Sequence, residues 1–454
     1  MIRRCVTLFF LTVLAIATPA QNPGGQIPGA GSGQVAAAGD FVFVLQDGVL
    51  YKFDAATLGL LGKVRLSDLE QKPAEVSEVE VVEVEEVEKV EGGLGEGWNS
   101  AIGLGGGAGG GVTAKSAVEL ALAWLARHQD EGGKWDSDQF MKHDVDGEMT
   151  DGVGRATNDV GVTGLSVLAL LGGGSTLRGG PHRDALKRAV GWLREQQGDN
   201  GLVGTNASHD FIYGHAIATF ALSEAYGLSK YKILRPTVQK AINYLESHRN
   251  PYGVWRYQPR DNDNDTSVTT WACMAYQSAR QFGLDVNANA NKLMASWYDQ
   301  VTDQTGRAGY TKRGEKSSRM PGDHVRRFPP EKGEAMTAAA LCARFVLGQD
   351  PEDEVIMKAS ADLLMAKRPK WEAGAIDPYY WWYGTQAMCQ MGGRHWQEWS
   401  KGLGDVIRAQ RSDGRFAGSW DPVGVWDCDG GRVYATAMYA LALEVRSRME
   451  RLVR

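Results

Sequence analysis

An excess of positive charge is what this chain lacks most clearly. Its 454 residues hold 49 Lys and Arg against 55 Asp and Glu, so the formal net charge is −6, and no cluster of basic residues stands out. A protein that binds nucleic acid needs a basic face to neutralise the phosphates. The sequence therefore predicts no nucleic-acid partner.

Cysteine is also scarce, with five residues in the whole chain. One of them, Cys5, lies in the N-terminal segment, and the others are Cys273, Cys342, Cys389 and Cys428. Cys273, Cys342 and Cys389 lie inside helical apolar runs, where a thiol behaves as a small hydrophobic group. We expect buried free thiols, although an exported protein can pair its cysteines and the sequence leaves their disulfide state open.

The apolar run near the N-terminus, residues 5–17, is too short to span a membrane readily. It follows Arg3 and Arg4 and precedes small residues at positions 18–20. This arrangement predicts a signal peptide over residues 1–20. The expected location is therefore periplasmic or extracellular. An uncleaved anchor, which would keep the protein near a membrane, is the alternative.

Two segments precede the main domain. Residues 36–66 alternate apolar and polar positions around Asp47-Gly48, which predicts a small β segment that resembles one blade fragment of a propeller repeat. Residues 67–96 hold eleven acids against two lysines, and Gly-rich sequence continues to residue 111. We expect residues 67–111 to be a flexible linker, and the alternation of Glu and Val leaves an added edge strand open.

From residue 112 onward the chain repeats one pattern. A helical run with a charged face ends in a polar residue, then Gly four positions later, then a large or apolar residue two further on. The clearest copy is Gln129, Gly133 and Trp135. The other copies are Gln197-Gly201-Val203, Arg249-Gly253-Trp255 and Gln410-Gly414-Phe416. Weaker starts near residues 291 and 355 bring the count to six units.

A second set of helical runs lies between these units. Its members are apolar on most faces and rich in small residues, as buried inner helices should be. They cover residues 162–171, 212–226, 267–282, 334–347, 379–391 and 432–445. Alternating outer and inner helices predict an all-α fold, an α6–α6 toroid over residues 112–448.

The Gln-x-x-x-Gly-x-Trp spacing of Gln129, Gly133 and Trp135 resembles the QW repeat of terpenoid cyclases. These belong to the prenyltransferase and squalene-oxidase repeat superfamily, whose members are α6–α6 toroids. The chain also resembles secreted toroid proteins of planctomycete-type bacteria, on the runs that include Asp265-Thr266 and Tyr434-Ala435-Thr436. The resemblance implies the fold and, as an activity, isoprenoid cyclisation or prenyl transfer.

The chain departs from the motifs that carry those activities. When the Asp-x-Asp-Asp-Thr motif of squalene–hopene cyclases is aligned on Asp265-Thr266, the position of the proton donor is Asn264, and an amide cannot protonate an alkene. The zinc-binding His of protein prenyltransferases falls on Ala435, and no Asp-x-Cys opens the preceding inner helix. We therefore expect no metal and no cofactor.

The inner helices of a toroid run parallel, so their N-termini open on one face. Asp263, Asp265 and His215 are the catalytic candidates there, as acids or as a base. The ligand-binding candidates are Asp159, Tyr213, Thr266, Trp271, Tyr380, Trp381, Trp382, Arg432 and Tyr434. The same face also collects Glu334, Asp377 and Asp427. The competing interpretation is that these residues are only helix caps and core aromatics, which any toroid needs.

These patterns predict an exported toroid that binds a small molecule, an isoprenoid or a glycan, or else a protein partner, at this face. One alternative is an isoprenoid cyclase or isomerase with Asp263 or Asp265 as the acid, and another is a glycan-degrading hydrolase or lyase. Paired carboxylates across the face would favour a glycosidase. A deep apolar cavity would favour a cyclase, and a filled cavity a scaffold.

Overall fold

The computed structural model describes residues 113–445, apart from Val145, Asp146 and Glu148, and four strands between residues 34 and 65. The chain divides into two compact units, Met1–Glu91 and Gly92–Arg454. The predicted signal peptide and the predicted linker lie outside the described residues.

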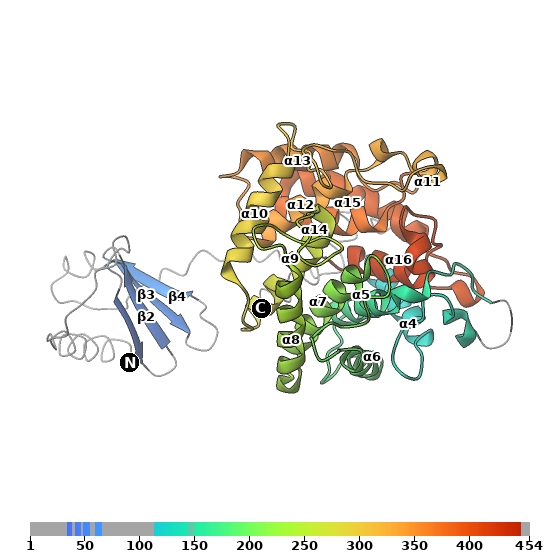
Figure 1. Cartoon of the computed structure of the whole chain (residues 1–454), viewed down its shortest axis with the longest axis horizontal. Helices are drawn as coiled ribbons and strands as arrows, with labels where there is room; N and C mark the ends of the chain where they lie inside the picture. Colours follow the sequence, from blue (N-terminus) through green and yellow to red (C-terminus); the bar gives the residue numbers. More distant parts are fainter. Residues whose placement is uncertain are drawn as a thin grey trace, which may run out of the picture. The chain divides into compact units, whose positions relative to one another are not determined.

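The first unit contains an antiparallel sheet whose strands follow one another in chain order (Figure 1). The strands are β1 (Gln34–Ala38), β2 (Phe41–Gln46), β3 (Val49–Asp54) and β4 (Leu60–Arg65). β2 and β3 pair on either side of residues 47–48, with Val44 opposite Tyr51. β1 was not expected from the sequence, because its run of alanines has low strand propensity.

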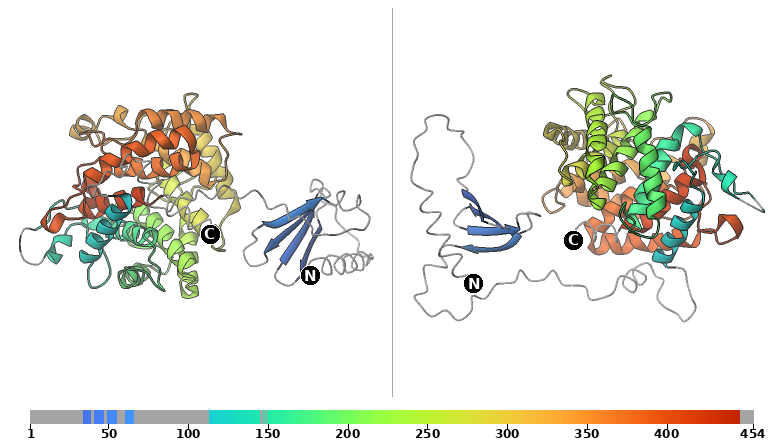
Figure 2. Two further views of the ribbon diagram at one scale, coloured as in Figure 1. Left: turned by 180° about the vertical axis from the view of Figure 1, so that it is seen from behind. Right: turned by 90° about the horizontal axis from the view of Figure 1, so that it is seen from below.

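The second unit is built around a ring of inner helices. They are α5 (Asp159–Gly172), α7 (Phe211–Ser229), α9 (Thr266–Gln281), α12 (Ala335–Val346), α14 (Pro378–Met391) and α16 (Asp427–Leu443). Each packs against the next, and α16 returns to α5, which closes the ring. Figure 2 shows them from behind and from below. Nearly all their residues are buried, which explains their apolar and small composition. The predicted all-α toroid is confirmed.

Outer helices cover this ring. They are α4 (Ala114–Arg127), α6 (Arg183–Glu195), α8 (Arg235–His248), α10 (Ala288–Val301), α13 (Val355–Ala366) and α15 (Gly393–Arg408). The shorter helices are η1 (Phe140–His143), η2 (Ala156–Asn158), η3 (Lys232–Leu234), α11 (Asp323–Arg327), η4 (Pro330–Lys332) and η5 (Gly414–Phe416). Each outer helix buries one stripe, as α6 does with Leu186 and Leu193. None of the described helices is long and apolar enough to cross a membrane.

The repeated polar residue joins neighbouring units. Gln129 Nε2 donates to the carbonyl of Gly133, 2.9 Å away in its own turn, and to that of Ala185, 2.8 Å away in α6. Gln410 Nε2 makes the same pair of bonds, to its own turn and to Ala117 of α4 at 2.8 Å. The last unit is thereby bonded to the first, and the outer layer closes as the inner ring does.

The prediction that Gly414 and Phe416 complete the repeated pattern in the last unit is wrong. The equivalent glycine is Gly418, with φ of +99°, where a Cβ would lie 2.3 Å from the carbonyl oxygen of Leu120. The equivalent aromatic residue is Trp420, whose Nε1 donates to Val406 O at 2.7 Å. The turn is longer in this unit and contains η5, so a fixed spacing selected the wrong residues.

A second repeated contact fixes each turn to an inner helix. The backbone N–H of Trp135 donates to Thr163 Oγ1 at 2.9 Å, and Trp255 bonds to Thr269 at 3.2 Å. The same contact joins Ala308 to Thr337 at 3.2 Å and Trp420 to Thr436 at 3.4 Å. In the second unit His215 takes the place of the threonine, because its Nδ1 accepts from Val203 N at 3.0 Å. These bonds hold the outer turns in register with the ring.

Replacing Thr163 with Val should lower stability, since the N–H of buried Trp135 would lose its acceptor at nearly unchanged side-chain volume. A buried unsatisfied donor costs about 1–3 kcal/mol. Urea unfolding followed by circular dichroism measures the loss. Thr237→Val, on the outer helix α8, is the matched control. An equal unfolding midpoint for the two variants would contradict the role given to this contact.

Candidate functional site

Three buried aspartates lie at the N-terminal ends of inner helices, the face called the mouth below. Asp265 and Asp377 cap α9 and α14, where their Oδ1 atoms accept from Val268 N at 2.7 Å and Tyr380 N at 3.0 Å. Asp427 begins α16 and its Oδ2 accepts from Gly424 N at 2.7 Å. Helix capping therefore uses one carboxylate oxygen of Asp265 and one of Asp377. A contact within a turn uses one carboxylate oxygen of Asp427.

Asp265 belongs to a tyrosine cluster formed with Arg256, Tyr257 and Tyr310. Its Oδ2 accepts from Tyr310 Oη at 3.2 Å, and the hydroxyls of Tyr310 and Tyr257 are 2.6 Å apart. The Arg256 guanidinium lies 5.3 and 5.7 Å from the two ring centres. Burial raises the pKa of Asp265 to about 7, against the opposing effect of these donors. This carboxyl changes its charge near neutral pH.

Asp377 and Asp427 form what we call the carboxyl pair. Asp377 Oδ2 and Asp427 Oδ1 have no hydrogen-bond partner among the described residues. The backbone joins the two segments, since Val425 N donates to Ile376 O at 3.1 Å. Burial raises the pKa of Asp427 to about 8, and the neighbouring Asp377 adds to the rise. Burial also raises the pKa of Asp377, while Arg319 and two backbone amides oppose the shift.

Tyr379 connects the tyrosine cluster with the carboxyl pair. Its hydroxyl lies 2.9 Å from Ser267 Oγ on α9. Burial raises the pKa of Tyr379, and the charges of Asp265 and Asp377 add to the effect, which places both acids near this ring. The polar groups of α9, α14 and α16 are therefore parts of one site.

The segment of residues 309–329, called the cover segment below, crosses the mouth. It brings Tyr310 to Asp265 at the start of α9, and Arg319 Nη2 to within 3.9 Å of Asp377 Oδ2 at the start of α14. His324 Nε2 donates to Val425 O at 2.8 Å, just before α16. In the structure this segment covers the mouth.

The catalytic candidates from the sequence lie in three different environments. Asp265 is buried in the tyrosine cluster, whereas the side chain of Asp263 is 67% exposed and pairs with Arg256 at 3.2 Å. His215 lies in the core, with Nδ1 accepting from Val203 N and Nε2 3.2 Å from Ala241 O. Burial lowers the pKa of His215 to about 3. Asn264, at the aligned position of the proton donor, accepts from Val254 N at 2.8 Å and stabilises a turn.

The aromatic candidates separate by helix face. Tyr213 and Tyr434 are half-buried at the mouth, where buried acids influence the pKa of both. Trp271 and Trp382 stack inside the ring, with ring centres 4.8 Å apart. Two further candidates have partners elsewhere in the fold. Tyr380 Oη donates to Lys367 O at 3.0 Å, and Trp381 packs against Trp371 and Tyr439.

The polar candidates Thr266, Arg432 and Asp159 hold loops. Thr266 Oγ1 donates to Gly309 O at 2.7 Å, which attaches the cover segment to α9. Arg432 is buried, with Nε donating to Asp151 O at 2.8 Å and its guanidinium 4.6 Å from the Phe416 ring. Asp159 accepts from Ser137 N at 2.9 Å and from Lys134 at 2.6 Å.

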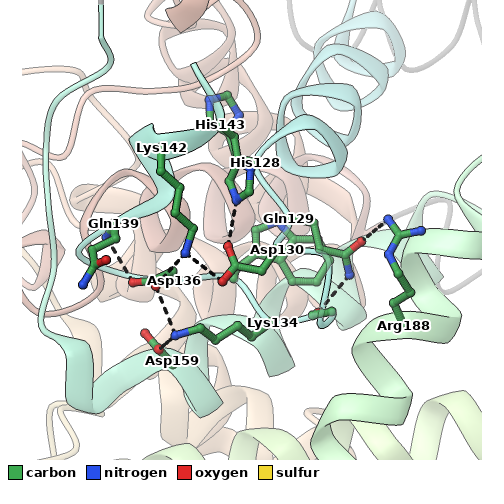
Figure 3. Close-up of polar contacts among 12 residues, drawn as sticks. His128, Gln129, Asp130, Lys134, Asp136, Gln139, Lys142, His143, Asp159 and Arg188 are labelled. Carbon is green, nitrogen blue, oxygen red and sulfur yellow. Dashed lines mark hydrogen bonds and ion pairs between the residues drawn. The ribbon is translucent and has the colours of Figure 1, made fainter. Parts of the chain in front are cut away.

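A second acidic group lies beside the start of α5. Carboxylate oxygens of Asp136, Asp138 and Asp159 come within 4.8 Å of one another. Figure 3 shows lysines among these and neighbouring acids: Lys134 bonds to Asp159, and Lys142 lies between Asp130 and Asp136, 2.9 and 3.1 Å away. Because lysine ammonium groups already neutralise Asp136 and Asp159, the group is an ion-pair network beside the first turn of the toroid.

Sequence reasoning did not select the residues that complete the mouth. Asp377 and Asp427 were expected on this face, but no motif singled them out from helix caps. Their signal was a lone Asp before an apolar run, which is also what a cap looks like. Tyr310 and Arg319 lie in an irregular loop, where no periodicity reports which side chains turn inward.

No protein family matches the chain, and no curated protein matches its sequence. Among solved structures it is similar to an inactive variant of an α-1,6-mannanase from Salegentibacter, with two neighbouring aspartates replaced, in complex with α-1,6-mannotetrose. The TM-score is 0.52 and the identity 10%, over 74% of this chain and 99% of that chain.

An unsaturated glucuronyl hydrolase specific for heparin has a TM-score of 0.51 at 12% identity, over 74% of this chain and 98% of that one. A type II terpene cyclase from Scytonema has a TM-score of 0.46 at 13% identity, over 74% and 99%. At such identities the likeness to the first two proteins shows the fold alone. That fold is the α/α toroid.

Replacing Asp265 with Asn should stabilise the protein at pH 8. The folded-state pKa is above the unfolded value, so the contribution of Asp265 to stability is fully present below about pH 4 and is lost as the pH rises through about 7. Asn caps a helix about as well as Asp and carries no charge to bury. The gain should reach a few kcal/mol at pH 8 and become smaller at pH 5.

Melting temperatures at the two pH values test this, with Asp263→Asn as the control that removes an exposed charge. A melting temperature of the Asp265 variant that is equal to or below that of the wild type at pH 8 would contradict the argument.

Proposed function

We propose that this protein is an exported, glycan-acting α/α toroid that binds a sugar chain at the mouth and cleaves a glycosidic bond by acid–base catalysis. One observation carries the proposal. Two buried carboxyls start neighbouring inner helices, and each has an oxygen that accepts no hydrogen bond within the described part of the chain. Buried polar atoms are normally satisfied, so such a pair is expected to meet a ligand.

Glycoside hydrolysis needs a protonated carboxyl on one side of the bond and a carboxylate on the other. A pKa of about 8 keeps the proton on Asp427 at neutral pH. Burial raises the pKa of Asp377 as well, but Arg319 and two backbone amides oppose that rise and favour its ionised form. Asp427 gives its proton to the glycosidic oxygen as the bond from that oxygen to the anomeric carbon breaks. Water attacks the anomeric carbon and loses a proton to Asp377. In acid–base pairs, the environment typically keeps one carboxyl protonated and the other ionised.

The aromatic residues of the mouth suit a sugar ligand. Tyr213, Tyr257, Tyr310 and Tyr434 are half-buried, so each combines a ring face with a polar hydroxyl. Sugars stack on such rings and bond to neighbouring carboxylates. The mannanase bound to mannotetrose and the heparin-specific hydrolase show that this fold accommodates glycan-acting proteins, which supports the choice of ligand. A location outside the cytoplasm, proposed from the signal peptide, would give access to such chains.

An isoprenoid cyclase is the second candidate, and the interior of the ring supports it less. Cyclisation needs an apolar cavity with an acid at its end. Trp271, Trp382 and Tyr383 meet inside the ring with at most 3% of each exposed, so their rings occupy the space in which a polyene would fold. Asn264, at the aligned donor position, is bonded within its turn. A purely structural role for the mouth would leave the unpartnered oxygens of the carboxyl pair unexplained.

Replacing Asp427 with Asn should lower glycan cleavage by about 10²–10⁴-fold, the usual contribution of a general acid, while binding is retained. The assay is release of reducing ends from mannan, heparin-derived and neutral glucan oligosaccharides, with binding measured by calorimetry. Asp263→Asn is the control and should keep full activity. Equal activity of the Asp427 variant and the wild type, or no binding of any glycan by the wild type, would overturn the proposal.

A further inference from the structure

Arg319 comes from outside the ring and reaches the carboxyl pair. Its side chain is 3% exposed, although it lies in the irregular cover segment. Nε donates to Phe328 O at 3.0 Å and Nη1 to Ser318 O at 2.8 Å, so the guanidinium is held by its own segment. The remaining nitrogen, Nη2, faces Asp377. A buried charge needs such fixed partners to offset its loss of hydration.

The distance between Arg319 and Asp377 decides which interaction the two side chains make. At 3.9 Å, Nη2 and Oδ2 attract each other as an ion pair but are too far apart for a hydrogen bond. The guanidinium therefore favours a negative charge on Asp377 without occupying the oxygen. Asp377 Oδ2 keeps its capacity to accept a proton or a hydrogen bond from a ligand.

Arg319 is the ion-pair partner of Asp377, and Asp427 has no ion pair among the described residues. Within the described part of the chain, the other titratable groups that interact electrostatically with the pair include His324 and Arg327 on the cover segment. Tyr379 on α14 and Tyr434 and Tyr439 on α16 also belong to this set. Both nitrogens of His324 are already used, by Met320 N at 3.2 Å and Val425 O at 2.8 Å, so His324 anchors the segment that carries Arg319.

We propose that Arg319 is a positioning residue of the mouth: it fixes the negative charge on Asp377 and thereby leaves the proton on Asp427. The catalytic role in this inference rests on the proposed function, but the charges of Asp377 and Asp427 can be measured without any substrate. The cover segment is then more than a surface loop, because it supplies the charge that makes two similar carboxyls different. Loss of that charge should make both acids compete for one proton.

The experiment compares the full chain with Arg319→Met, Arg319→Lys and, as control, Arg326→Met on the exposed face of the same segment. Carboxyl carbons are labelled with ¹³C in aspartate, and their signals are assigned through Asp377→Asn and Asp427→Asn. Arg319→Met should raise the titration midpoint of Asp377 by about 1–3 pH units, the usual effect of a neighbouring Arg on an Asp. The midpoint of Asp427 should fall in the same variant. Arg319→Lys should restore part of both shifts.

Unchanged midpoints in a folded Arg319→Met variant, or equal shifts in Arg326→Met, would overturn the inference. If Arg319→Met does not fold, Arg319→Lys carries the test, since moving the charge should still displace the midpoint of Asp377. Where a glycan is cleaved, the acid limb of the pH profile of kcat should move with Asp377 while KM changes little. If no glycan is cleaved, the proposed function fails and the titration still decides the role of Arg319.

Discussion

The first-turn amides of the inner helices are the constraint on which the mouth depends. Four of the six described inner helices have no side-chain cap, but the first-turn amides of a helix have no intrahelical partner, so a side chain can accept from them. Asp265 and Asp377 do so at 2.7 and 3.0 Å. Because the inner helices run parallel, the capping acids gather on one face. The fold therefore brings carboxyls together at the mouth before any catalytic requirement is considered.

The same ring depends on bonds that run sideways between units. Gln129 and Gln410 each join the turn of one unit to the next outer helix, and Thr163 and Thr436 join turns to inner helices. These side chains satisfy backbone groups that irregular turns leave without partners. A unit that lost its contact would weaken two neighbours, because each turn is shared. These bonds join the units of the ring whose helix N-termini form the mouth.

The sequence was sufficient for the fold because helical periodicity reports burial directly, and inner and outer runs differ in charge. It was insufficient where a residue's role depends on a contact distant in sequence. His215 looked like a base, but it occupies the position that Thr163 has in the first unit. Asp263 and Asp265 looked alike, yet one is exposed and the other buried. Arg319 gave no sequence signal, because only the path of the cover segment brings it to Asp377.

Capping alone does not explain why the mouth has aspartates. Asn caps a helix about as well as Asp, and an amide can be buried without the cost of a charge. Asp265 and Asp427 are nonetheless both fully buried, and burial raises the pKa of each to about 7 and 8. Both carboxyls are ionised in the unfolded chain at neutral pH and burial opposes that ionisation, so the fold bears a free-energy cost that an amide substitution at each position would remove. Groups that keep such a cost are typical of sites that bind or transfer protons. At the carboxyl pair the cost is joined to two oxygens without a hydrogen-bond partner among the described residues, and this combination, more than the presence of acids, supports the proposed function over a role in helix capping alone.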